Sequence, residues 1–118
     1  MKKNILFCGT PIFAQATLEA IFRYQEELNY NLVGVVTIKD KISGRGQKPQ
    51  ESVIKKIAKS LKLNIFTPIN LEDSDFIRKI KNLNLDLIIV VAFKKLPSIF
   101  FNIPRLGTIN LHASILPK

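Results

Sequence analysis

The sequence predicts an α/β fold, namely a Rossmann-like, doubly wound parallel sheet. Short apolar runs that suit buried strands alternate with segments whose apolar residues recur at helical spacing. The apolar runs lack strict alternation with polar residues, which is typical of strands covered on both faces, as in a parallel sheet. The order is β-α-β-α-β-α-β-(short α)-β, so right-handed crossovers between parallel strands are expected.

The first two strands and the helix between them follow from local patterns. A strand is expected over residues 4–8, where β-branched and aromatic residues end at Gly9. Pro11 suits the first turn of a helix expected over 12–28. Proline has no backbone N–H, and an N–H in the first turn makes no hydrogen bond within the helix. A second strand is expected over 32–38, which is apolar almost throughout.

The later elements rest on the same signals. Residues 39–50 combine basic residues with two glycines and a proline, so an exposed loop is expected there. Acidic residues surround the start of a helix expected over 74–83, where the helix dipole favours negative charge. The other expected elements are a helix over 51–63, strands over 64–66, 86–92 and 106–111, a short helix or turn over 97–101, and a loop over 113–118.

Length and composition exclude several classes of protein. The 118 residues suit one domain, since domains peak at roughly 100–150 residues, and 47% hydrophobic content supports a buried core rather than disorder. No stretch of about 20 apolar residues exists, so no membrane-spanning helix is expected. Only residues 5–8 are apolar between the charged start and a glycine, which is too short a run for a signal peptide.

Cysteine and histidine usage narrows the chemistry. Cys8 is the only cysteine, so it has no partner for an internal disulfide. It lies in an apolar run, and we expect a reduced core thiol in a cytoplasmic protein. One cysteine and one histidine do not suffice for an ordinary zinc site, so no metal is expected.

The charge leaves function open. A net charge of +9 suits a polyanionic partner, because lysine and arginine displace counterions from phosphates. Fourteen of the 18 basic residues are lysine, however, and an AT-rich coding sequence would produce the same bias.

Three segments are expected at the carboxyl ends of strands, where doubly wound sheets bind ligands. In the first, Gly9, Thr10 and Pro11 form either a turn that admits a ligand or a plain strand-to-helix turn; the Gly-x-Gly-x-x-Gly dinucleotide motif is absent. In the second, Arg45 lies between two glycines and near Lys48. That loop is either a phosphate-binding loop with a bidentate donor at its tip or an ordinary solvated loop.

The third segment surrounds the only histidine. Side chains at i and i+2 of a strand point the same way, so Asn110 and His112 are expected to project together from a strand end. An amide donor beside an imidazole suits oxyanion stabilisation and proton transfer in acyl-type chemistry. The alternative is a histidine satisfied by backbone groups, with the asparagine serving the turn.

Taken together, the motifs resemble the amino-terminal part of the methionyl-tRNA formyltransferase family over the whole chain. The matching segments, in order, are Gly9–Pro11 with Phe13–Ala14, Gly44–Gly46, and Asn110–Pro117. The last motif alone would indicate only the wider group of enzymes that use 10-formyltetrahydrofolate, which includes glycinamide ribonucleotide formyltransferase. The first two point to the tRNA-specific branch.

The resemblance implies that formyl passes from 10-formyltetrahydrofolate to the amino group of methionine on initiator tRNA. It implies that Asn110 and His112 polarise the formyl oxygen and stabilise the tetrahedral intermediate. Arg45, with Lys48 in the same loop, would approach the tRNA acceptor end. The folate-contacting segment would comprise Ser114, Ile115, Leu116 and Pro117.

The chain also departs from the family pattern. The family's catalytic aspartate lies downstream of every residue present, and its carboxy-terminal β-barrel tRNA-binding domain is missing. The basic loop starts with Lys39–Ile42, where many relatives have Pro-Asp-Arg-Pro, and 92–97 differs from the usual Ala-Tyr-Gly pattern. We therefore expect residues 1–118 to be a shortened amino-terminal catalytic domain that is inactive alone.

Two other functions stay open at this point. A related formyltransferase could act on a nucleotide or an amino sugar, and replacing Arg45 would then leave tRNA use unaffected. A non-catalytic RNA-binding chain would bind any RNA with a steep salt dependence and would not respond to folate.

Overall fold

The computed structural model describes residues 2–10, 14–37, 41–42, 49–50, 53–91, 93 and 95–111. Their main feature is a five-stranded sheet with the order β5-β2-β1-β6-β7, in which every neighbouring pair is parallel. The strands are β1 (Lys3–Gly9), β2 (Tyr30–Val36), β5 (Ile65–Phe66), β6 (Leu87–Val91) and β7 (Thr108–Leu111). The predicted parallel α/β fold is confirmed.

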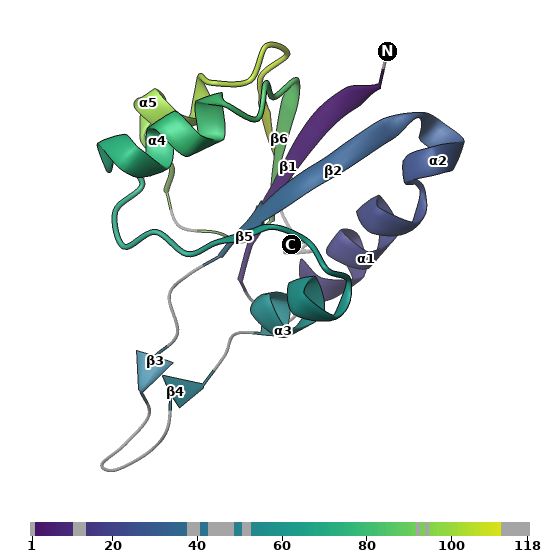
Figure 1. Ribbon diagram of the computed structural model, residues 1–118, viewed down its shortest axis with the longest axis horizontal. Coiled ribbons are helices and arrows are strands. Elements are labelled where there is room, and N and C mark those ends of the chain that lie inside the picture. The colour runs from purple at the N-terminus through teal and green to yellow at the C-terminus, as the bar shows by residue number, and fades with distance from the viewer. Residues whose placement is uncertain are drawn as a thin grey trace, which may run out of the picture.

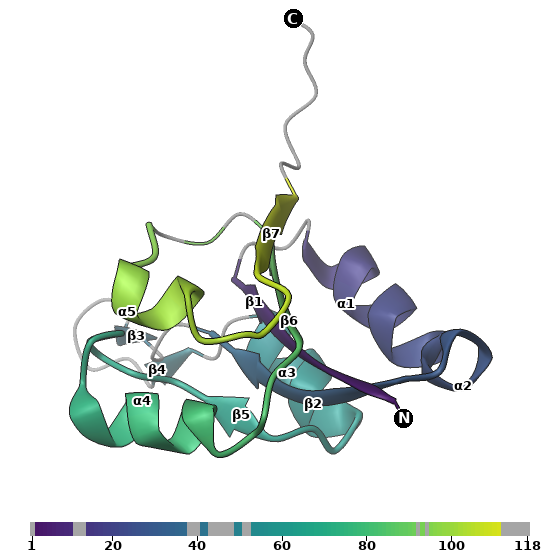
Figure 2. The ribbon, with the colours of Figure 1, turned by 90° about the horizontal axis from the view of Figure 1, so that it is seen from above.

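Helices cover both faces of this sheet, as Figure 1 shows. One face packs against α4 (Ser74–Lys81) and α5 (Ser98–Phe101), and the other against α1 (Gln15–Arg23) and α3 (Val53–Ser60). Figure 2 shows α4 and α5 on one side of the central strands and α1 on the other. The doubly wound arrangement therefore follows from two separate apolar cores, one on each face.

Alternation along the central strands builds these two cores. In β1, Leu6 and Cys8 belong to the core under α4 and α5, whereas Phe7 belongs to the core under α1 and α3. All three side chains are fully buried, because a central parallel strand is covered on both faces. In β6, Val90 and Val91 divide between the two cores in the same way.

The predicted helix over 12–28 is wrong in one respect, because it is interrupted at Tyr24. There α1 ends and a short α2 (Gln25–Leu28) begins, which ends in turn at Asn29 with a φ of 60°. The Gln25 side chain donates to the Phe22 carbonyl and accepts from the Leu32 N–H. A side chain that bonds local backbone in this way competes with a continuous helix.

The prediction of an irregular loop over 39–50 is also incomplete. Two short strands, β3 (Lys41–Ile42) and β4 (Pro49–Gln50), pair antiparallel within it and form a separate two-stranded sheet. Short loops with glycine between two extended segments favour such hairpins. The residues between the two strands lie outside the described part of the chain.

The helix predicted over 74–83, present as Ser74–Lys81, and the predicted buried thiol of Cys8 are confirmed. Asp73 caps α4, since its side chain accepts a hydrogen bond from the Phe76 N–H at 3.0 Å. Cys8 is a free, fully buried thiol. Within the described residues, no helix combines the length and the apolar character that a bilayer crossing requires.

Candidate functional site

The sheet order places the topological switch point between β1 and β6. The chain leaves β1 towards β2 and β5 on one side, and then returns to β6 and β7 on the other. Ligands of doubly wound proteins bind beside such a point, at the carboxyl ends of the strands. The last residues of these two strands, Gly9 and Val91, are paired neighbours.

Gly9 is required by the close approach of its neighbours. A Cβ at this position would lie 3.0 Å from the Val91 carbonyl oxygen and 3.0 Å from the Phe7 ring. The backbone of β1 therefore ends in contact with β6, and Thr10 follows at once in a half-buried position. Residues 11–13 lie outside the described part of the chain, so the ligand-binding turn expected at Gly9, Thr10 and Pro11 stays a prediction.

Asn110 lies on β7, near the same carboxyl ends of the strands. It pairs with Val90 of β6, which in turn pairs with Cys8 of β1. Two strand spacings separate β7 from β1, so the backbones at Asn110 and Cys8 are roughly 10 Å apart. Asn110 thus lies close to the turn at Gly9, although 100 residues separate the two in the chain.

The environment of Asn110 suits a group that binds a ligand. Paired residues of neighbouring strands share a face, so Asn110 lies on the face of Val90, which packs under α4 and α5. Asn110 is exposed, and its side-chain amide has no hydrogen-bond partner among the described residues. An exposed amide of this kind can donate to a ligand at the end of β6.

Most other predicted site residues lie outside the described part of the chain. They are Pro11, Arg45, Lys48, His112, Ser114, Ile115, Leu116 and Pro117. The joint projection of Asn110 and His112 therefore stays a prediction. It is supported by the position of Asn110 in the penultimate place of β7, from which the chain runs directly to His112.

Cys8 has no role in the chemistry of this site. Burial raises the pKa of its thiol far above the ordinary value and removes it from solvent. A nucleophilic cysteine needs the opposite conditions, namely exposure and a lowered pKa. Among the described residues, no group of three or more His, Cys, Asp or Glu side chains is placed to hold a metal ion.

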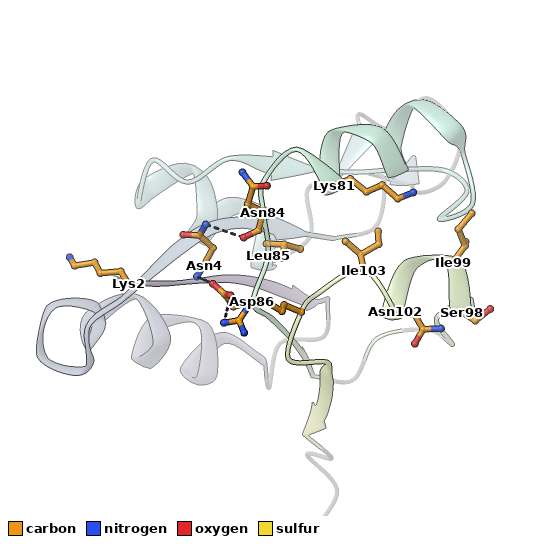
Figure 3. Close-up of a pocket in the computed structure, with 11 residues that line it drawn as sticks. Lys2, Asn4, Lys81, Asn84, Leu85, Asp86, Ser98, Ile99, Asn102 and Ile103 are labelled. Carbon is orange, nitrogen blue, oxygen red and sulfur yellow. Dashed lines mark hydrogen bonds and ion pairs between the residues drawn. The ribbon is translucent and has the colours of Figure 1, made fainter.

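Sequence reasoning missed an open cleft at the opposite end of the sheet, drawn in Figure 3. It has a volume of about 850 Å³ and lies between the amino ends of β1 and β6, the end of α4, and α5. Its lining includes Lys81, Asn84, Ser98 and Asn102. In Figure 3 the last three side chains point in different directions, whereas a binding site has convergent polar groups. The candidate site therefore stays at the carboxyl ends of the strands.

Fold and geometry thus define a doubly wound α/β domain whose candidate site lies at the carboxyl ends of β1, β6 and β7. A sequence model described as formyl transferase matches residues 1–118. The chain belongs to the formyl transferase family.

Several curated relatives are methionyl-tRNA formyltransferases. The protein of Flavobacterium johnsoniae is 47% identical over 117 residues, which cover 99% of this chain and 36% of that protein. The protein of Azobacteroides pseudotrichonymphae is 48% identical over 118 residues, with coverages of 99% and 35%. The protein of Bacteroides fragilis is 46% identical over 121 residues, with coverages of 100% and 36%. The chain spans little more than a third of the length of these relatives.

Proposed function

We propose that this chain supplies the formyl-transfer site of a methionyl-tRNA formyltransferase that acts in translation initiation in the cytoplasm. The formyl group would pass from 10-formyltetrahydrofolate to the α-amino group of methionine on initiator tRNA. The observation that carries this proposal is the position of Asn110, which is exposed at the carboxyl edge beside the switch point. Membership of the formyl transferase family supports the type of reaction.

The proposed chemistry uses Asn110 where charge develops. Attack of the methionine amine on the formyl carbon forms a C–N bond and places negative charge on the formyl oxygen. The amide N–H of Asn110 would donate to that oxygen, and a donor already held in place costs no reorganisation during the reaction. His112 would move a proton as the carbon–N10 bond of the folate breaks and tetrahydrofolate leaves.

The remaining site residues are assigned by their places in the chain. The folate would contact Ser114, Ile115, Leu116 and Pro117, which begin three residues after the end of β7. Arg45 and Lys48 lie between β3 and β4 and would contact the tRNA. The guanidinium of Arg45 offers paired N–H donors to phosphates or base edges.

Residues 1–118 would form the amino-terminal part of the catalytic domain in a longer protein. The relatives' greater length supports this, as does the lack of a residue in this chain that matches the family's catalytic aspartate. Groups that act as a unit lose most of their effect when one is missing. The 118 residues alone should therefore show no formyl transfer.

The test replaces Asn110 in a protein that contains this chain and has the full length of the relatives. Asn110→Ala should lower kcat by about 10²- to 10³-fold and change folate affinity much less, because the lost donor acts mainly on the oxyanion. Asn102→Ala, an exposed asparagine at the end of α5, is the matched control. A kcat within a few-fold of the parent in the Asn110 variant would remove its proposed role.

One further variant tests the proposed acceptor. Arg45→Ala should weaken the use of charged initiator tRNA with little effect on folate affinity, since an arginine in this loop would contact phosphate or bases. Equal loss of folate and tRNA binding would show instead that the loop supports the fold.

A further inference from the structure

Burial alone does not fix the position of β7. Within the described residues, β7 has β6 as its only neighbouring strand. Three of its four residues are exposed, namely Ile109, Asn110 and Leu111. The register of a strand is strongly specified where one face is buried and weakly specified elsewhere. A slip of one residue would turn Asn110 to the opposite face of the sheet.

Backbone hydrogen bonds do not select the register either. The Leu106 N–H donates to the Asp86 carbonyl at 2.7 Å, and the Ile88 N–H donates to the Gly107 carbonyl at 3.2 Å. Pro104 has no N–H, so a shift that puts it in the place of Leu106 would lose a bond, but a ladder in which Thr108 takes that place could form equivalent bonds. Side chains that bind particular positions then select between these two registers.

The Asp86 carboxylate provides such a recognition, as Figure 3 shows. One oxygen, Oδ1, accepts from Arg105 Nε at 3.0 Å and lies 2.9 Å from Arg105 Nη2. The other oxygen, Oδ2, accepts from the Asn4 N–H at 2.8 Å. A single carboxylate therefore joins the start of β1, the start of β6 and the segment that enters β7.

Charge and hydrogen-bond direction make this junction specific. The Asp86 side chain is only 15% exposed, and its partner Arg105 is 61% exposed. The hydrogen bond from the Asn4 N–H lowers the pKa of the Asp86 carboxyl, and the Arg105 side chain lowers it further. The carboxylate is therefore ionised at neutral pH, and both of its oxygens accept strong, directional hydrogen bonds.

Asn4 fixes the other side of the junction. Its Nδ2 donates to the carbonyls of Leu83 at 3.2 Å and Asn84 at 3.1 Å, and its own carbonyl accepts from the Asp86 N–H at 2.9 Å. These bonds attach the segment before β6 to the start of β1. Asp86 is thus held on a fixed frame, against which Arg105 sets the start of β7.

We propose that Asp86 and Arg105 are positioning residues for the formyl-transfer site: their ion pair fixes the register of β7 on β6 and so holds Asn110 level with Val90. The proposal rests on the proposed function for its catalytic consequence, although the register itself is a property of the fold. Arg105 lies five residues before Asn110, so it acts through the strand and never touches substrate.

The structure offers a matched control for this pair. Asp75 and Arg78 form an ion pair of the same residue types at 2.6 Å, but both lie within α4 and both are well exposed. An ion pair within one helix fixes no strand register. The variants are therefore Asp86→Asn and Arg105→Gln, singly and together, with Asp75→Asn and Arg78→Gln as controls.

Two measurements are made on a protein that contains this chain and has the full length of the relatives. Cross-strand nuclear Overhauser contacts between β6 and β7 report the register without reference to activity. Steady-state kinetics report kcat and the KM for 10-formyltetrahydrofolate. Each single variant should weaken or shift the β6–β7 contacts and lower kcat by about 10- to 100-fold, because small misplacements of reacting groups are costly. KM should change less than threefold.

The double variant should recover part of the lost β6–β7 contacts and of the lost kcat. Its two amide side chains can hydrogen-bond each other, whereas in each single variant the remaining charged residue has lost its ion-pair partner. The control variants should leave both measurements unchanged. Unaltered β6–β7 contacts in both single variants would overturn the proposal. Altered contacts with an unchanged kcat would leave the register role intact and remove the catalytic role of Asn110.

Discussion

β1 and β7 run parallel in one sheet, on either side of β6, and each carries part of the candidate site. They differ in what surrounds them. The last five residues of β1 are buried, whereas three of the four residues of β7 are exposed. The comparison shows that one sheet can specify its strands in two ways, by apolar burial at the centre and by polar side-chain contacts at the edge.

The polar side-chain contacts described for β7 involve the face covered by α5 and the segment that enters the strand. The Thr108 hydroxyl donates to the Phe101 carbonyl of α5 at 2.7 Å, and Asp86 binds Arg105 just before the strand. The Thr108 hydrogen bond contributes only about 0.5–1.5 kcal/mol to stability. An edge strand held in this way is positioned precisely while it adds little to the stability of the whole domain.

The largest expected effect tests burial at the centre. Phe7→Ala should lower the free energy of unfolding by about 3–5 kcal/mol, because Phe7 is fully buried between α1, α3 and the sheet. Leu111→Ala should cost under about 1 kcal/mol, because Leu111 is already 43% exposed. Urea unfolding measures both. Equal losses at the two positions would show that β7 is part of the core and would remove the distinction.

The same contrast explains how much of the fold the sequence predicts. The central strands were predicted within a few residues because their apolar runs are long and continuous, as in Leu87–Val91. The break at Tyr24 was not predicted, since it depends on where the Gln25 side chain finds a backbone partner. The hairpin of β3 and β4 was not predicted because each strand has only two residues, which is too short for an alternating apolar pattern.

Only part of the candidate site was predicted, for a related reason. Its position at the carboxyl edge follows from strand order, and Gly9 and Asn110 do lie at that edge. The junction at Asp86 was missed, because Asn4, Asp86 and Arg105 are far apart in sequence and belong to no motif. Only the parallel register brings their side chains together.

Intermediate losses of stability are expected at two glycines, one at the end of β1 and one just before β7. Gly9→Ala should cost about 1–3 kcal/mol, because its Cβ would meet the Val91 carbonyl and the Phe7 ring at 3.0 Å. Gly107→Ala should cost about 1–2 kcal/mol for a different reason, since its φ of 109° strains an L-residue although no atom lies within 4 Å of the added Cβ.

Thermal and urea unfolding give these two losses, and the nature of each is tested by a larger side chain. Gly9→Val should be clearly worse than Gly9→Ala, because the space is closed. Gly107→Ser should match Gly107→Ala, because the strain lies in the backbone and the space is open. A large difference between the two variants at Gly107 would contradict this assignment.

The smallest expected effect on stability concerns the side of β7 that pairs with no other strand among the described residues. Ile109 is 46% exposed on this strand, and an edge strand with exposed apolar residues is a template for pairing with another chain. The 118-residue chain should therefore self-associate, as measured by sedimentation velocity. Ile109→Lys should reduce association while changing stability by less than about 0.5 kcal/mol, since a charged residue blocks edge pairing at an exposed position. Ile99→Lys, at 49% exposure on α5, is the matched control and should leave association largely intact. A monomeric parent chain, or equal effects of the two lysines, would show that exposed apolar area in general, and not the strand edge, governs the behaviour of this region.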